Sequence, residues 1–147
     1  MKAMVKYVGG LAFLGKARTN HWVPMDSSQE GLPPAAATSP KEMFLLAVHA
    51  CTGMDVASLL NKRRIAFRSL EVEGEAAVAE EHPRVFTRID LVFKLEGENV
   101  PVPEIERAIK SSQEKYCSVS AMMRKNCPIF WTATLNGAQV LSGGGAA

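Results

Sequence analysis

Three cysteines, Cys51, Cys117 and Cys127, carry the most reactive side chains of this sequence. An odd number of cysteines without a CxxC pair fits neither the disulfide framework of a secreted protein nor a zinc knuckle. We therefore expect reduced thiols, and any disulfide among them should be transient rather than structural. A thiolate attacks a peroxide oxygen to give a sulfenic acid, and a second thiol condenses with that acid to form a disulfide.

Two of these cysteines have more than one interpretation. Cys51 lies in the middle of a predicted helix over residues 40–64, where a free cysteine is commonly a small buried apolar side chain. As a nucleophile it would need a nearby positive charge that stabilises a thiolate. Cys117 lies between two predicted helices, and a helix N-terminus could stabilise a thiolate there. From the residues alone, Cys117 is therefore the better nucleophile, and the role of Cys51 stays open.

Other side chains near these cysteines have simpler explanations. Asp55 is one helical turn after Cys51, and because a neighbouring carboxylate opposes thiolate formation, we interpret it as structural or paired with a base. His49, Cys51 and Asp55 do not share one helix face, so no metal site is expected. No bound cofactor is expected either. Cys127 directly precedes Pro128 and is expected to be a bystander.

The pattern of apolar residues predicts the elements that hold these side chains. We expect short strands before residue 26, a loop over 27–39, a helix over 40–64, strands over 70–78 and 85–95, a helix over 104–116, a short helix over 118–125, a strand over 128–135 and a disordered tail over 143–147. Ser39 and Glu42 form a capping box in front of the first helix. This separation of strands and helices is typical of an α+β fold with an antiparallel sheet, in a single domain over 1–147.

Composition and charge exclude several classes of partner. The net charge of +2 arises from 17 basic and 15 acidic residues that are scattered along the chain, so nucleic acid is not an expected partner. The longest apolar run, Met43–Ala50, is far shorter than the ~20 residues of a membrane span. The N-terminus has no signal-peptide pattern. We therefore expect a cytoplasmic protein that does not enter a membrane.

Two segments resemble the OsmC/Ohr family, namely Thr38–Cys51, continued by Met54–Val56, and Glu114–Ser120. The order of strands, long cysteine-bearing helix, two strands, helix and second cysteine also matches the order in that family. The resemblance implies an OsmC-like fold with antiparallel sheets packed on a long central helix, in an intertwined homodimer. It also implies thiol-dependent reduction of hydroperoxides at active sites on the subunit interface.

The resemblance also implies which residues act. It makes Cys51 the nucleophile and Cys117 the thiol that closes the disulfide, the reverse of the assignment from the residues alone. The family uses an arginine from its N-terminal region and a glutamate, for which Arg18 and Glu42 are the candidates, with Lys41 at the alternative position. Glu42 and Cys51 are ~13.5 Å apart along one helix, so Glu42 would have to serve the site of the partner subunit.

The function that the resemblance implies is a thiol-dependent peroxidase that reduces organic hydroperoxides and receives electrons from an external dithiol. Met43, Met54, Met122 and Met123 lie close in sequence to the two cysteines and would form an apolar wall that suits an organic substrate. The alternative is an OsmC-like binding or stress-response module without efficient turnover.

Overall fold

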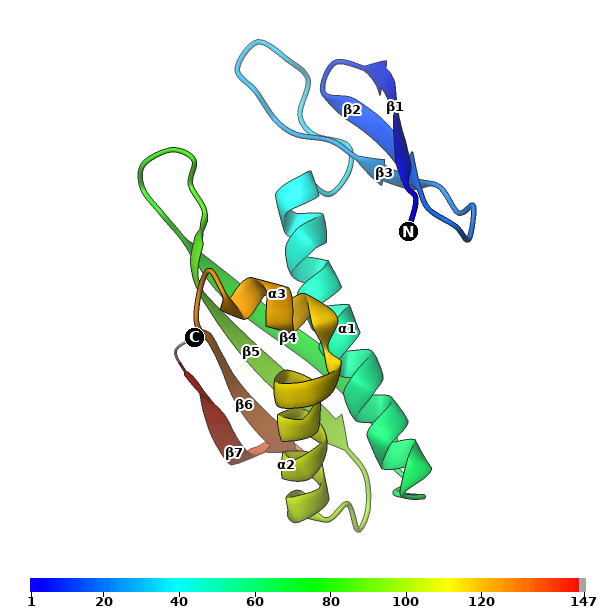
Figure 1. Cartoon of the computed structure of the whole chain (residues 1–147), viewed down its shortest axis with the longest axis vertical. Coiled ribbons are helices and arrows are strands. Elements are labelled where there is room, and N and C mark those ends of the chain that lie inside the picture. Colours follow the sequence, from blue (N-terminus) through cyan, green and yellow to red (C-terminus); the bar gives the residue numbers. More distant parts are fainter. Residues whose placement is uncertain (146–147) are drawn as a thin grey trace. The chain divides into compact units, whose positions relative to one another are not determined.

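The computed structural model describes residues 1–145 of the chain. These residues form two compact units, Met1–Leu46 and the residues from Ala47 onward, and the long helix α1 (Pro40–Lys62) contributes residues to both. Each unit has its own sheet (Figure 1). The description below therefore treats each unit by itself.

The first unit is an antiparallel sheet in the order β1-β2-β3 (Figure 1). Its strands are β1 (Met4–Gly9), β2 (Ala12–Lys16) and β3 (Val23–Met25), as the apolar pairs near the N-terminus predict. Residues 26–39 contain no helix or strand. Tyr7 and Phe13 pack edge to face across the first hairpin, yet both side chains are exposed. Much of the apolar surface of this unit is therefore uncovered within one chain.

Helix α1 begins where the capping box predicts. The Oε2 atom of Glu42 accepts hydrogen bonds from the backbone N–H of Ser39 at 2.8 Å and from its hydroxyl at 2.6 Å. The helix ends at Lys62, because Arg64 adopts a left-handed conformation with φ of 58° and the N–H of Ile65 bonds back to the carbonyl of Leu60. Both ends of the helix are thus set by local residues.

By length and composition α1 is apolar enough to cross a membrane, with a mean hydropathy of 1.6 over its most apolar window. Core helices of soluble proteins pass the same test, and α1 buries Val48, Thr52, Val56 and Leu60 at successive helical turns. This spacing places the four side chains on one face of the helix. We therefore interpret α1 as the core helix of its fold.

The second unit is a four-stranded sheet in the order β4-β5-β6-β7, covered on one face by helices (Figure 1). Its strands are β4 (Ser69–Val78), β5 (Phe86–Glu96), β6 (Ile129–Leu135) and β7 (Ala138–Gly145). Three helical segments, α2 (Val102–Ser111), the π-helix η1 (Ser112–Tyr116) and α3 (Ser118–Arg124), connect β5 to β6. Because the chain crosses the sheet through these helices, β5 and β6 pair in parallel, whereas the neighbouring pairs are antiparallel.

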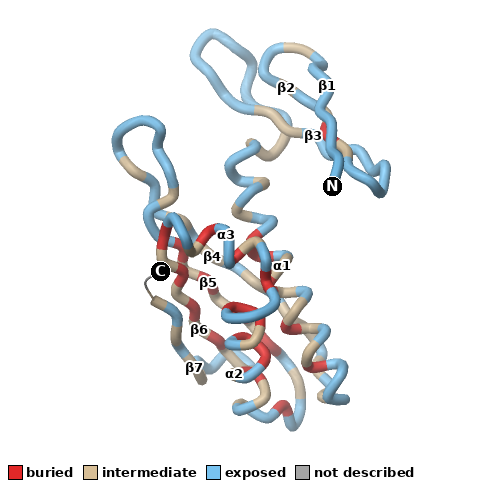
Figure 2. Tube along the Cα trace, viewed as in Figure 1, coloured by how far each residue is buried: buried red, intermediate tan, exposed pale blue. Residues whose placement is uncertain are grey.

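The core of the second unit lies between this sheet and the helices α1 and α2 (Figure 2). Alternate residues of β5 point into it, and Ile89, Leu91, Phe93 and Leu95 are almost completely buried. A Cβ atom at Gly74 of β4 would lie 3.0 Å from Nε2 of His49, so the glycine makes room for this side chain of α1. The α+β class predicted from sequence is confirmed, with one parallel strand pair in addition to the antiparallel ones.

Two details differ from the sequence-based prediction. Gly143–Gly145, predicted as part of a disordered tail, belong to β7, whereas Ala146 and Ala147 lie outside the described residues. Gly143 is required there because a Cβ atom would lie 2.5 Å from the ring of Trp131. Tyr116 was predicted on the buried helix face but is exposed, because the wider π turn of η1 rotates it away from that face.

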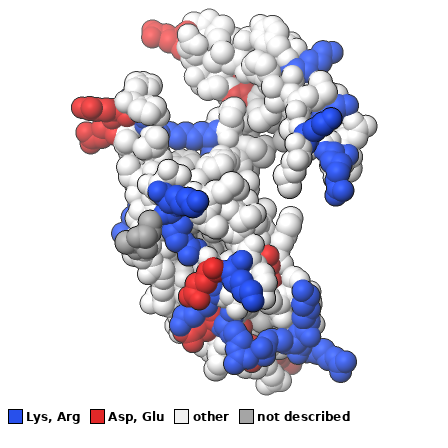
Figure 3. Space-filling view, viewed as in Figure 1, with Lys and Arg blue, Asp and Glu red and all other residues white. Residues whose placement is uncertain are grey.

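Charged side chains on the visible face of the second unit are mixed in sign (Figure 3). Near the end of α1, Arg63 forms an ion pair with Glu104 at 3.0 Å, and Lys110 pairs with Glu106 along α2 at 2.7 Å. Such exposed pairs contribute little to stability. They do show that basic groups here have acidic neighbours.

Candidate functional site

The second unit brings two cysteines and one carboxylate together. The Sγ atoms of Cys51 and Cys117 and a carboxylate oxygen of Asp55 all lie within 4.8 Å of one another. Cys51 and Asp55 are neighbours because they are one turn apart on α1. Cys117 reaches them from the junction between η1 and α3. We call these three residues the thiol cluster.

The π turn before Cys117 determines its position. The backbone N–H of Cys117 donates to the carbonyl of Ser112 at 2.9 Å, which closes the wider turn of η1. Cys117 then becomes the N-cap of α3, and its Sγ atom accepts a hydrogen bond from the N–H of Ser120 at 3.3 Å. Its side chain is buried, with only 2% exposed. The sulfur of Cys117 is therefore held at the N-terminus of α3.

The surroundings of Cys51 favour its neutral thiol. Burial raises the pKa of Cys51, and the hydrogen bond with the Cys117 thiol and the charge of Asp55 raise it further. A backbone hydrogen bond from Val119 acts in the opposite direction but does not reverse the shift. A nearby positive group would oppose this shift, and the thiol cluster itself contains none.

A buried chain of hydrogen bonds leads to Asp55. The amide of Gln113 donates to Thr52 Oγ1 at 2.9 Å, the hydroxyls of Thr52 and Ser112 are 2.8 Å apart, and Ser112 Oγ donates to Asp55 Oδ2 at 2.9 Å. Each hydroxyl has one proton, so because Ser112 donates to the carboxylate, Thr52 must donate to Ser112. The guanidinium of Arg124 completes the chain by donating to Gln113 Oε1 at 3.1 Å. All donors thus point toward the thiol cluster.

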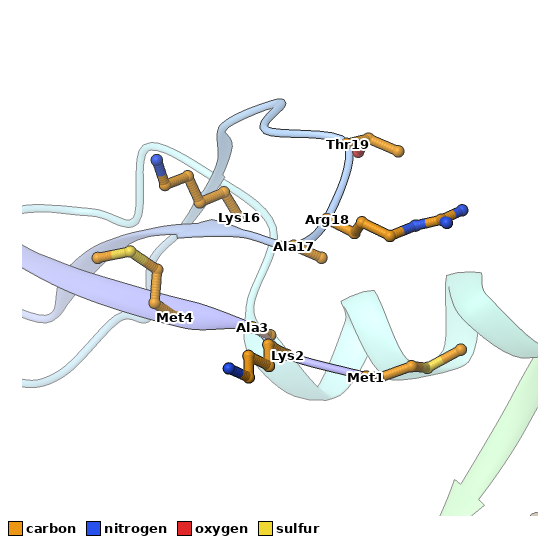
Figure 4. A pocket seen from close by; sticks show the side chains of 8 residues that line it. All are labelled: Met1, Lys2, Ala3, Met4, Lys16, Ala17, Arg18 and Thr19. Atoms are coloured by element: carbon orange, nitrogen blue, oxygen red, sulfur yellow. The ribbon is translucent and has the colours of Figure 1, made fainter.

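Glu42 and Arg18, the two other predicted site residues, belong to the first unit. Glu42 is engaged in the capping box, and hydrogen bonds from the Ser39 hydroxyl and backbone N–H lower its pKa. Arg18 lies in the loop after β2 and lines an open cavity of about 930 Å³ with residues 1–4, 16–17 and 19. In Figure 4 the side chains of Arg18 and Met1 extend in the same direction from neighbouring segments. Their predicted part in the chemistry stays a prediction.

Other residues that the sequence singled out lie around the thiol cluster or away from it. Cys127 is buried, and burial raises its pKa. His49 is buried as well, its pKa is lowered by burial, and its Nε2 atom has no hydrogen-bond partner among residues 1–145. Met54 and Met122 are exposed, with 71% and 58% of their surface accessible, whereas Met123 is buried.

Sequence reasoning found both cysteines and noted Asp55, but it did not find the hydrogen-bond chain. Thr52 is one residue after Cys51, and Ser112 and Gln113 open the π turn, yet all three are ordinary residues of a helix in the sequence. An available signal was a run of polar residues, Ser111–Gln113, within a helix that otherwise buries an apolar face. Such residues need buried partners, which the sequence does not identify.

Comparison with known proteins places this chain in a family. The family described as OsmC-like protein matches residues 33–132, and the chain belongs to it. Protein YhfA of Escherichia coli (strain K12) is 40% identical over 125 residues, which cover 85% of this chain and 90% of YhfA.

Solved structures agree with this assignment. A structure from structural genomics is 36% identical with a TM-score of 0.82, and the match covers 92% of this chain and 98% of that one. An organic hydroperoxide resistance protein OsmC from Legionella pneumophila has the same fold, with a TM-score of 0.66 at 18% identity over 91% of this chain and 97% of that one. The prediction of the family is therefore confirmed.

Proposed function

We propose that this chain is a thiol-dependent peroxidase that reduces organic hydroperoxides with Cys51 and Cys117. The observation that carries the proposal is the proximity of the two sulfur atoms, which lie within 4.8 Å of each other although their residues are far apart in sequence. A small side-chain movement brings two such sulfurs to the ~2.05 Å of a disulfide bond. Cys51 is on α1 and Cys117 is the N-cap of α3, so regular structure of the second unit holds the pair.

The reaction has two steps at these sulfurs. The Cys51 thiolate attacks one oxygen of the hydroperoxide, an S–O bond forms, the O–O bond breaks, and the alcohol leaves after taking up a proton. The Cys117 thiolate then attacks the sulfenic sulfur of Cys51, a disulfide forms, and the hydroxyl leaves as water after protonation. An external dithiol reduces this disulfide by thiol–disulfide exchange and is itself oxidised. No bound cofactor takes part.

The accessibility of the two sulfurs supports Cys51 as the residue that meets the peroxide. Cys51 is partly exposed, whereas Cys117 is buried and accepts a hydrogen bond from Ser120. A substrate from solvent reaches the partly exposed thiol first. The buried sulfur lies within 4.8 Å of that of Cys51, close enough to resolve the sulfenic acid.

The exposed methionines support an organic substrate. Met54 and Met122 are on the helices that carry the two cysteines and expose most of their surface. A hydrocarbon group gains about 0.8 kcal/mol per buried CH₂, so a few methylenes favour an alkyl hydroperoxide over hydrogen peroxide by roughly tenfold or more in kcat/KM. The Legionella pneumophila protein of the same fold is an organic hydroperoxide resistance protein, which supports the same substrate class.

We propose further that the chain acts as a cytoplasmic homodimer. The first unit exposes large apolar side chains that one chain leaves uncovered, among them Val5, Tyr7, Phe13 and Trp22. Surface of this kind is typical of a protein interface. Arg18 and Glu42, which belong to the same unit, are proposed as the arginine and glutamate of the site.

Peroxide consumption with a dithiol reductant tests the proposed function. Cys51→Ser is expected to abolish turnover of cumene hydroperoxide, because no sulfenic acid can form. Cys117→Ser should react once and then over-oxidise, which mass spectrometry detects as sulfinic acid on Cys51. Cys127→Ser is the matched control and should retain activity. Normal turnover by Cys51→Ser would contradict the assignment of roles.

One observation favours a second function, an OsmC-like binding or stress-response module without efficient turnover. The pKa of Cys51 is raised, and the thiol is a poor nucleophile. If the native chain consumes neither cumene hydroperoxide nor tert-butyl hydroperoxide while its thiols stay reduced, this second function is the better conclusion.

A further inference from the structure

We propose that Cys51, Asp55 and Cys117 form a binding site for zinc(II), with two thiolates and one carboxylate as ligands. The proposal does not depend on the peroxidase reaction, because it requires only the positions of these three side chains. Zinc in proteins is bound by thiolate sulfur, imidazole nitrogen and carboxylate oxygen, most commonly in tetrahedral geometry. The thiol cluster offers donors of the first and third kind.

The distances within the thiol cluster are close to those of such a site. Zinc binds sulfur at about 2.3 Å and carboxylate oxygen at about 2.0 Å, so tetrahedral ligands lie roughly 3.3–3.8 Å from one another. The three ligand atoms lie within 4.8 Å of one another here. Zinc binding would therefore require the ligand atoms to approach one another by up to about 1 Å.

Regular structure supplies two of the three ligands in a favourable spacing. Cys51 and Asp55 are separated by one turn of α1, the spacing at which two ligands on one helix face a single zinc ion. Cys117 enters from the N-cap of α3 and completes the third side. Three protein ligands leave a fourth position for water or an external thiol.

Neighbouring groups already orient all three ligands. Ser112 donates to one carboxylate oxygen of Asp55 and leaves the other oxygen for a metal. The N–H of Ser120 donates to the sulfur of Cys117, and the N–H of Val119 bonds to that of Cys51. Donors of this kind fix ligand orientation and offset negative charge on the sulfurs.

Charge balance also favours a cation. Binding converts two thiols into thiolates and releases two protons, so Zn²⁺, two thiolates and one carboxylate give a net charge of −1. The dication therefore offsets most of the negative charge of these three ligands.

Cobalt(II) replaces zinc as a visible probe of this site. The full-length, reduced, metal-free chain is titrated anaerobically with Co²⁺, and one equivalent should give an intense thiolate-to-cobalt charge-transfer band that added Zn²⁺ abolishes. Cys51→Ser and Cys117→Ser should each reduce the band and weaken binding at least tenfold. Asp55→Asn should weaken it by a similar factor, and Cys127→Ser should leave it unchanged.

Several results would overturn the proposal. They are native affinity in Asp55→Asn, loss of the band in Cys127→Ser, or no charge-transfer band in the native chain at one equivalent. X-ray absorption of the native zinc-loaded chain is a second measurement that needs no variant, and it should count two sulfur ligands. A different number of sulfurs contradicts the proposed ligands. Peroxide consumption by the metal-free chain, measured in parallel, reports on the proposed function separately.

Discussion

Replacement of Thr52 by valine tests the buried hydrogen-bond chain that leads to the thiol cluster. Valine has nearly the shape of threonine, so Thr52→Val removes one hydroxyl and leaves the packing of α1 in place. Thr52 is completely buried, and its hydroxyl bonds to both Gln113 and Ser112. The substitution therefore leaves two buried groups with one partner fewer each.

The cost follows from these two groups. The Gln113 amide N–H loses an acceptor at 2.9 Å in a nearly buried position, which costs about 1–3 kcal/mol. Ser112 keeps its hydrogen bond to Asp55 and loses only the one that its hydroxyl oxygen accepts from Thr52, which costs about 0.5–1.5 kcal/mol. Thr52→Val should therefore lower the free energy of unfolding by about 1.5–4.5 kcal/mol.

Urea unfolding followed by circular dichroism measures this change, with Thr52→Ser as the matched control. Serine keeps the hydroxyl and loses one buried methyl group, so it should cost only about 1 kcal/mol. The double variant Thr52→Val/Ser112→Ala should cost less than the sum of its single changes, because both remove the same bond. A loss below about 0.5 kcal/mol in Thr52→Val would refute the reasoning, and so would equal losses in the valine and serine variants.

Three further predictions concern other parts of the chain. Hydrogen bonds from Ser39 lower the pKa of Glu42, so the ionised side chain stabilises the fold at neutral pH, and this stability is lost as pH falls through the lowered pKa. The difference in unfolding free energy between Glu42→Gln and the native chain should therefore disappear in titrations that extend well below pH 4.5. Gly143→Ala should cost about 1–3 kcal/mol in urea unfolding, because its Cβ would press on Trp131 at 2.5 Å. Sedimentation at micromolar concentration should show a dimer that does not dissociate without unfolding, and a folded monomer would contradict this.

Local signals in the sequence were sufficient for most elements of the fold. Ser39 and Glu42 predict the start of α1, because a capping box depends only on residues three apart. Alternation of apolar and polar residues predicts β5, whose inward residues Ile89 and Phe93 are fully buried. Both features depend on neighbours in the chain, which the sequence displays directly.

Features that depend on distant residues could not be predicted in the same way. The glycines of β7 look like a tail, but Gly143 is there because of the ring of Trp131 on the adjacent strand. The parallel pairing of β5 with β6 follows from where the intervening helices lie. The hydrogen bond between Ser112 and Asp55 joins residues that only the fold brings together, through a π turn without a sequence signature.

The thiol cluster itself indicates which condition decides its chemistry. Burial, the Cys117 thiol and the Asp55 carboxylate all raise the pKa of Cys51, and a nearby cation would lower it. An arginine beside the cluster, the predicted role of Arg18, would supply that charge and leave both sulfurs free for the S–O and S–S bonds of the peroxidase reaction. Zinc would supply it by binding both sulfurs, which prevents the disulfide. Cys51 and Cys117 should therefore reduce peroxide when the cation is a guanidinium and become inactive when it is a metal ion.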